Sequence, residues 1–200
     1  VGPRDGWDLS EVSYLQNLDV SSQELYPSDV FFKSDGLKMY VSGTDGDDVN
    51  EYNLSTAWDV STASYSQSLS IASQETGLAG FYIKPDGTKL YATGYVGDGV
   101  YEYNLSTACD VSTASYSQTF SVSGQEATPY TVSFKSDGTK MYIGGVSGDD
   151  VNEYTLSTAW DVSTASYNQN FSLAARTDTP SGIYFKPDGT ELDVTGLTGN

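Results

Sequence analysis

Short apolar runs stand on both sides of an Asp-Gly pair that recurs along the chain. In the second copy, Phe81-Tyr82-Ile83 precedes the pair and Leu90-Tyr91-Ala92 follows it. Glycine adopts positive φ at little cost, and a Lys-Pro-Asp-Gly-Thr segment between two such runs is typical of a tight β-hairpin. The pattern predicts one hairpin at each Asp-Gly pair: Asp35-Gly36, Asp86-Gly87, Asp137-Gly138 and Asp188-Gly189.

Two further strands follow each hairpin. A glycine-rich loop, Gly43 to Asp48 in the first copy, leads into Val-Asn-Glu-Tyr and Leu54, which predicts a third strand. The fourth runs from Tyr65 to Ile71 and alternates with a period of two, with serine on almost every position of one face. No segment shows apolar spacing of three and four residues over a useful length, so essentially no helix is expected.

The whole pattern repeats with a period of 51 residues. Trp7, Trp58, Cys109 and Trp160 are each followed by aspartate and are evenly spaced. A gapless array of four-stranded antiparallel units of this length is typical of β-propeller blades. A β-solenoid is the competing architecture, but its coils pair in parallel, whereas tight hairpins require antiparallel neighbours. We therefore predict an all-β fold, a single propeller domain or segment over 1–200, with repeats 7–57, 58–108, 109–159 and 160–200.

The hairpin sequence resembles the blade core of the YVTN and WD-repeat β-propellers. The matching stretch runs from Ile83 to Tyr91, and comparable residues occur in all four copies. The connection from Leu54 to Tyr65 is similar to that of repeat-rich proteins of marine bacteria and their viruses. This resemblance implies the propeller fold, and it implies little about activity, since propellers serve as lectins, scaffolds and enzymes.

Both ends of the array depart from the repeat. The opening strand of the first copy, Leu9 to Asp19, has a different pattern, and the last copy has Glu191 and Asp193 where the others have Lys-x-Tyr. The fourth copy reaches Gly199-Asn200 where the loop into its third strand should begin, so an incomplete last blade is expected. Val1 to Trp7 or another chain could supply the strand. An open edge of this kind favours self-association or a partner protein.

Composition removes several classes of function. Nine Lys and Arg stand against 27 Asp and Glu, and a net charge of −18 should repel nucleic acid and anionic membranes. The absence of histidine excludes a Ser-His-Asp triad and most catalytic zinc sites. The single cysteine excludes a disulfide framework. Because Cys109 takes the place of a tryptophan, it is interpreted as a small buried hydrophobe rather than a reactive thiol.

The remaining candidate chemistry lies in carboxylates and aromatic side chains. Glu51, Glu102 and Glu153 recur at one place in successive blades, and a repeated acid usually serves the blade rather than catalysis. The acidic loops offer hard oxygen ligands for calcium, although aspartate beside glycine suits a turn equally well. No other cofactor is expected. The weak calcium candidates are Asp47, Asp48, Asp98, Asp149 and Asp150.

Most tyrosines recur, like the acids, and are predicted to lie between blades. Those left exposed could bind glycans. The recurring positions are Tyr40, Tyr91 and Tyr142 on the second strand and Tyr52, Tyr103 and Tyr154 on the third.

Three functions follow from these observations. The first is a non-catalytic structural or interaction module, extracellular or on a virion surface, and it is the one the strict repeat favours. The second is a lectin-like adhesin or receptor-binding module with equivalent sugar sites on several blades. The third is an enzyme of the propeller lactonase or glycosidase kind, which would need carboxylates outside the repeat, together with a metal, at the axial channel.

Overall fold

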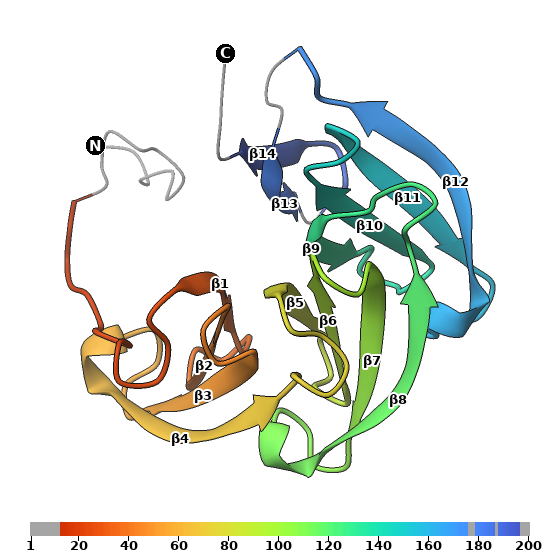
Figure 1. Cartoon of the computed structure of the whole chain (residues 1–200). Helices are drawn as coiled ribbons and strands as arrows, with labels where there is room; N and C mark the ends of the chain where they lie inside the picture. Colours follow the sequence, from red (N-terminus) through yellow and green to blue (C-terminus); the bar gives the residue numbers. More distant parts are fainter. Residues whose placement is uncertain (1–12, 176–178, 187, 197–200) are drawn as a thin grey trace.

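The computed structural model describes residues 13–175, 179–186 and 188–196, and it shows a series of antiparallel sheets arranged in an arc (Figure 1). Three sheets have four strands each, ordered as in the sequence, and the last described sheet has two. The strands are β1 (Pro27–Phe32), β2 (Lys38–Gly43), β3 (Asp48–Leu54) and β4 (Ala63–Ser70); β5 (Leu78–Ile83), β6 (Lys89–Gly94), β7 (Gly99–Leu105) and β8 (Ala114–Ser121); β9 (Pro129–Phe134), β10 (Lys140–Gly145), β11 (Asp150–Leu156) and β12 (Ala165–Ser172); and β13 (Pro180–Phe185) and β14 (Leu192–Gly196).

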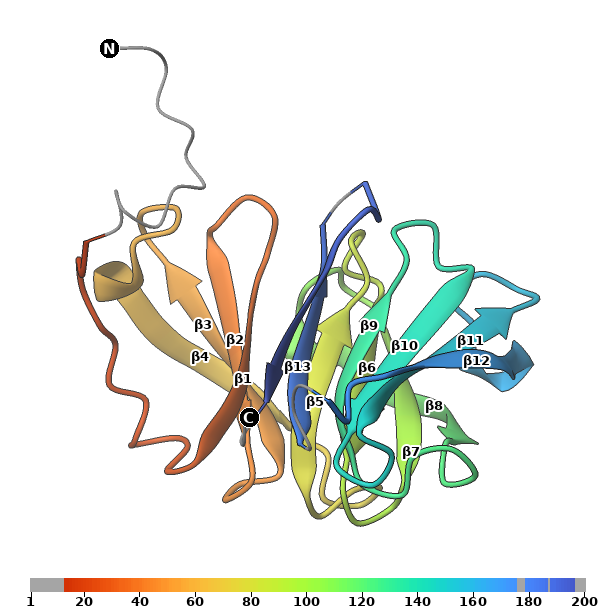
Figure 2. The same cartoon turned by 90° about the horizontal axis from the view of Figure 1, so that it is seen from above.

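The predicted propeller architecture is confirmed. Each Asp-Gly pair turns the chain between the first two strands of a blade, and its glycine has φ between +72° and +74°. The first strands β1, β5, β9 and β13 lie innermost, and β5 contacts both β1 and β9 while β13 contacts β9 (Figures 1 and 2). Each sheet begins with the strand that precedes the Asp-Gly turn, so its boundaries are offset from the repeats counted from tryptophan to tryptophan.

Two expectations need adjustment. The described residues contain no α-helix, and no helix long and apolar enough to cross a membrane, but a 3-10 turn follows each complete third strand. An aspartate caps each turn: Asp59, Asp110 and Asp161 accept a hydrogen bond from the backbone N–H two residues ahead. The opening strand predicted over Leu9 to Asp19 is wrong for residues 13–19, which belong to no strand. Residues 9–12, and Val1 to Trp7, lie outside the described part of the chain.

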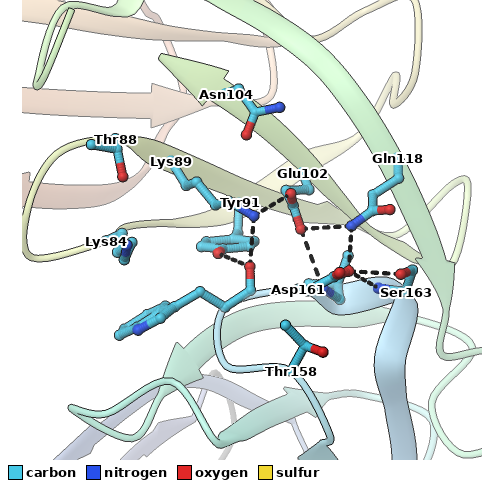
Figure 3. A network of polar contacts seen from close by, with 12 residues as sticks. Lys84, Thr88, Lys89, Tyr91, Glu102, Asn104, Gln118, Thr158, Asp161 and Ser163 are labelled. Atoms are coloured by element: carbon cyan, nitrogen blue, oxygen red, sulfur yellow. Dashed lines mark hydrogen bonds and ion pairs between the residues drawn. The ribbon is translucent and has the colours of Figure 1, made fainter. Parts of the chain in front are cut away.

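A recurring set of polar contacts, here called the interblade clamp, joins consecutive blades (Figure 3). In the second blade, Glu102 is buried and accepts from Lys89 Nζ at 2.6 Å and from Gln118 Nε2 at 3.0 Å. It also accepts the Val162 N–H of the third blade at 3.2 Å, and Gln118 reaches Asp161 Oδ1 at 2.7 Å. The same acid therefore neutralises a lysine of its own blade and fixes the linker of the next one.

A backbone carbonyl completes the clamp. The Tyr91 hydroxyl and Lys89 Nζ both donate to the Trp160 carbonyl oxygen, at 2.7 and 2.8 Å. At the preceding junction the Tyr40 hydroxyl donates to the Cys109 carbonyl oxygen at 2.7 Å. The repeated glutamates are thus structural, as the sequence predicts, and the blades are held in fixed relative positions along the arc.

The hairpin glycines provide a test of how tightly the linkers pack. A Cβ at Gly138 would lie 2.3 Å from the Trp160 ring, whereas a Cβ at Gly189, with the same φ of +73°, would meet nothing within 4 Å. We expect Gly189→Ala to cost only the left-handed backbone strain, about 1–2 kcal/mol. Gly138→Ala should cost a further ~1–3 kcal/mol, because the indole must move. Urea unfolding of both variants measures the difference, and equal losses would contradict the packing described.

Candidate functional site: the axial pocket

A pocket of about 1080 Å³ lies on the inner side of the arc, between the first strands of the blades and the hairpins that follow them. Strands β1, β5, β9 and β13 all contribute to its wall. Its aromatic side chains include Phe31 and Tyr82, whose rings meet edge to face with centroids 6.0 Å apart. The pocket is therefore a largely apolar and aromatic cleft at the propeller axis. Concave apolar clefts of this kind, with a few polar groups, are typical of ligand-binding sites.

Asp29 is the carboxylate of this pocket that lies within a strand. Its Oδ2 accepts the Phe81 N–H of the next blade at 3.1 Å, and its Oδ1 accepts the Val30 N–H at 2.8 Å. Burial raises the pKa of Asp29 to about 6, although the two amide hydrogen bonds act in the opposite direction. A carboxyl group that titrates near neutral pH is suited to general acid–base chemistry.

Asp29 does not belong to the repeat. The equivalent positions in the other blades hold Gly80, Thr131 and Gly182. Asp29 was not among the predicted site residues, which came from the repeated acids. The signal that identifies it in the sequence is a lone acid on the first strand of one copy, where the other three copies have none.

Lysines gather at the hairpin end of the pocket. Lys135, Lys140 and Lys186 contribute to the lining, together with the turn acid Asp188. Lys135 pairs with Asp137 at 2.6 Å and Lys186 with Asp188 at 3.3 Å, and all four of these side chains are well exposed. Lys140 is paired with Glu153 at 2.9 Å, so each lysine of the lining has a carboxylate partner and the pocket carries no marked excess of positive charge.

The predicted calcium ligands lie elsewhere, in the loops between the second and third strands. Asp47, Asp98 and Asp149 have φ between +46° and +51°, as the turns require. The Asp150 carboxylate accepts from Asn152 at 2.5 Å and from the Asn170 side chain, and Asp48 accepts from Asn50. Within the described ranges, no three Asp, Glu or Cys side chains are grouped as a metal site would need. Calcium binding by these loops stays a prediction.

The other predicted positions have the expected surroundings. Cys109 is buried, as its interpretation as a small buried hydrophobe predicts. The recurring tyrosines are buried between or within blades, with Tyr142 half-buried against Phe185 of the last blade. Trp58 differs, because 57% of it is exposed.

No family model matches the chain, and the search of curated proteins found no relative. Solved structures do match. A candidate 6-phosphogluconolactonase of Bacteroides uniformis has a TM-score of 0.61 at 14% identity over 84% of this chain and 46% of its own. A second, from Bacteroides fragilis, has a TM-score of 0.55 at 15% identity over 74% and 39%. The periplasmic gluconolactonase PpgL of Pseudomonas aeruginosa has 0.51 at 14% identity over 72% and 38%.

These likenesses establish the propeller fold, and the chain spans less than half the length of each of these three proteins. They also correct the sequence analysis. The prediction that the chain is a non-catalytic structural or interaction module, and not an enzyme, is contradicted, because several of the matched propellers are named as lactonases. The prediction rested on the strict repeat, which describes what the blades share and gives no information about a residue that departs from it, such as Asp29.

Proposed function

We propose that the axial pocket belongs to a hydrolase of sugar-derived lactones, with Asp29 as the general base. The observation that carries the proposal is a single carboxyl group outside the repeat, half-buried at the axial pocket and with its pKa raised to about 6. The names of the matched propellers favour the same chemistry. The further assignment of the repeat to the YVTN and WD-repeat class rests on the motif from Ile83 to Tyr91 and forms part of this proposal.

The reaction needs one proton acceptor and one proton donor, and Asp29 serves as both. As a carboxylate it takes a proton from water while the water oxygen bonds to the lactone carbonyl carbon. The tetrahedral intermediate then breaks its bond to the ring oxygen, and the protonated Asp29 returns the proton to that oxygen. The product is an open-chain hydroxy acid. Phe31 and Tyr82 supply aromatic surfaces against which the faces of a sugar ring pack.

The pH profile of lactone hydrolysis tests the proposal. The base must be ionised, so kcat/KM for δ-gluconolactone, above the spontaneous rate, should rise tenfold per pH unit below about pH 6 and level off above it. A pH-stat assay records the acid released. Hydrolysis no faster than the buffer background at every pH would reject the lactonase proposal.

The sequence analysis also predicted an extracellular or virion-surface location, and this stays a prediction.

A further inference from the structure

Residues 13–20 lie where the outer strand of a blade preceding the first would lie. Gln16 hydrogen-bonds the Asp59 carboxylate, as Gln67 does Asp110 at 2.6 Å one repeat later. Leu18 and Val20 pack on the apolar cluster of the first blade. The first blade is therefore arranged to receive a neighbour on this side.

The rest of that side is open. Val30 is 54% exposed, whereas its equivalents in the next two blades, Phe81 and Val132, are 3% and 4% exposed beneath the preceding blade. Trp58 is 57% exposed, whereas its equivalent Cys109 is 6% exposed. Phe32 and Trp58 form a pair with centroids 5.5 Å apart. We call Val30, Phe32 and Trp58 the leading face.

The last blade offers the complementary side chain. In the second blade, Tyr82 packs on the Phe134–Trp160 pair of the third, with centroids 5.3 and 6.2 Å away. That pair is itself 5.3 Å apart, close to the spacing of Phe32 and Trp58. The residue equivalent to Tyr82 in the last blade is Tyr184, and it is 55% exposed.

We propose that two copies of this chain assemble head to tail into a closed ring, with Tyr184 of each copy packed on the Phe32–Trp58 pair of the other. This contact would repeat the one between the second and third blades, where Tyr82 packs on the Phe134–Trp160 pair, so the same packing already occurs within the chain. Two copies also approximate the length of the matched propellers, of which one copy covers 38–46%. The inference does not depend on the lactonase proposal, although each copy would then close the open side of the other's axial pocket.

The new junction is weaker than the internal ones. Glu191 and Asp193 stand where Lys89 and Tyr91 donate to the Trp160 carbonyl, so the corresponding carbonyl at the new junction has neither of these two donors. A net charge of −18 on each copy adds long-range repulsion. Association should therefore strengthen at high salt, which screens the repulsion.

Sedimentation equilibrium of the 200-residue chain, over a range of concentrations and at low and high salt, tests the proposal. We expect a species of twice 21.5 kDa. Tyr184→Ala and Trp58→Ala should each weaken association more than tenfold. Tyr167→Ala, which removes a similarly exposed tyrosine from the outer strand β12, should leave it unchanged.

The alanine variants could lose association because they misfold, so a variant that is expected to strengthen association provides a second test. Glu191→Lys combined with Asp193→Tyr restores the Lys-x-Tyr of the repeat and should tighten the dimer more than tenfold. A wild-type chain and a restored variant that both stay at 21.5 kDa at every concentration would overturn the proposal. So would a dimer indifferent to Tyr184→Ala, or a series of masses beyond two chains, which would indicate open polymers. Lactone hydrolysis is measured separately, so the two proposals can fail independently.

Discussion

Replacing Asp29 by asparagine should lower kcat/KM for lactone hydrolysis by about 10²–10⁴-fold, the usual contribution of a general base. Asparagine keeps the size of the side chain, and its amide oxygen can still accept the Phe81 N–H that Asp29 accepts at 3.1 Å. It cannot take a proton from water at any pH of the assay. The variant should therefore lose both the rate and the rise in rate near pH 6, while the chain keeps its fold.

The matched control is Asp86→Asn. Asp86 is an aspartate outside the pocket lining, in the hairpin that follows β5, where it pairs with Lys84 at 2.7 Å and accepts the Thr88 N–H at 3.0 Å. Its loss should leave the rate unchanged, and circular dichroism and urea midpoints should show both variants folded. If Asp29→Asn were folded and fully active, Asp29 would not be the base, and the lactonase proposal would lose the observation on which it depends.

The sequence predicted the blades well because their determinants are local. Each Asp-Gly turn needs one glycine at positive φ, and each strand needs an alternating run of a few residues, so the hairpins could be located without knowledge of their neighbours. A structural role for the repeated glutamates was also predictable, because a residue that recurs in three successive copies is expected to satisfy a need of the blade itself.

The contacts between blades were harder to predict from the sequence. Glu102 binds the amide of Val162, 60 residues further along, and no spacing within one repeat indicates which linker atom it reaches. The axial site was missed for the opposite reason. Asp29 is conspicuous only against Gly80, Thr131 and Gly182, and its raised pKa comes from burial that the packing of β1 on β5 creates.

The pocket also shows why overall charge predicted little about the ligand. A net charge of −18 describes the field far from the chain, which is screened within about 10 Å at ordinary salt concentrations. Close to the axis, Lys135 and Lys186 are paired with Asp137 and Asp188, so a bound group would meet these local ion pairs at short range rather than the net charge of the chain.

Glu102 should contribute strongly to stability through the polar contacts of the interblade clamp. Glu102 is 2% exposed and accepts from Lys89, Gln118 and the Val162 amide together. Removing one partner of a buried ion pair leaves the other without compensation and typically costs about 3–5 kcal/mol. We expect Glu102→Ala to lose that amount in urea unfolding, with the transition becoming less cooperative as the second and third blades separate.

Glu153 is the internal control, because it occupies the same position one blade later. Its side chain is 12% exposed, and it pairs with Lys140 at 2.9 Å and with the Asn168 amide, both within its own blade. An ion pair with access to water contributes about 0–1 kcal/mol, so Glu153→Ala should cost far less than Glu102→Ala. Equal losses would mean that the glutamate stabilises only its own blade. A large difference would assign the stability to the contact that Glu102 makes with Val162 across the junction. Contacts of this kind hold neighbouring blades together, and with them the inner strands around the axis, including the strand that carries Asp29.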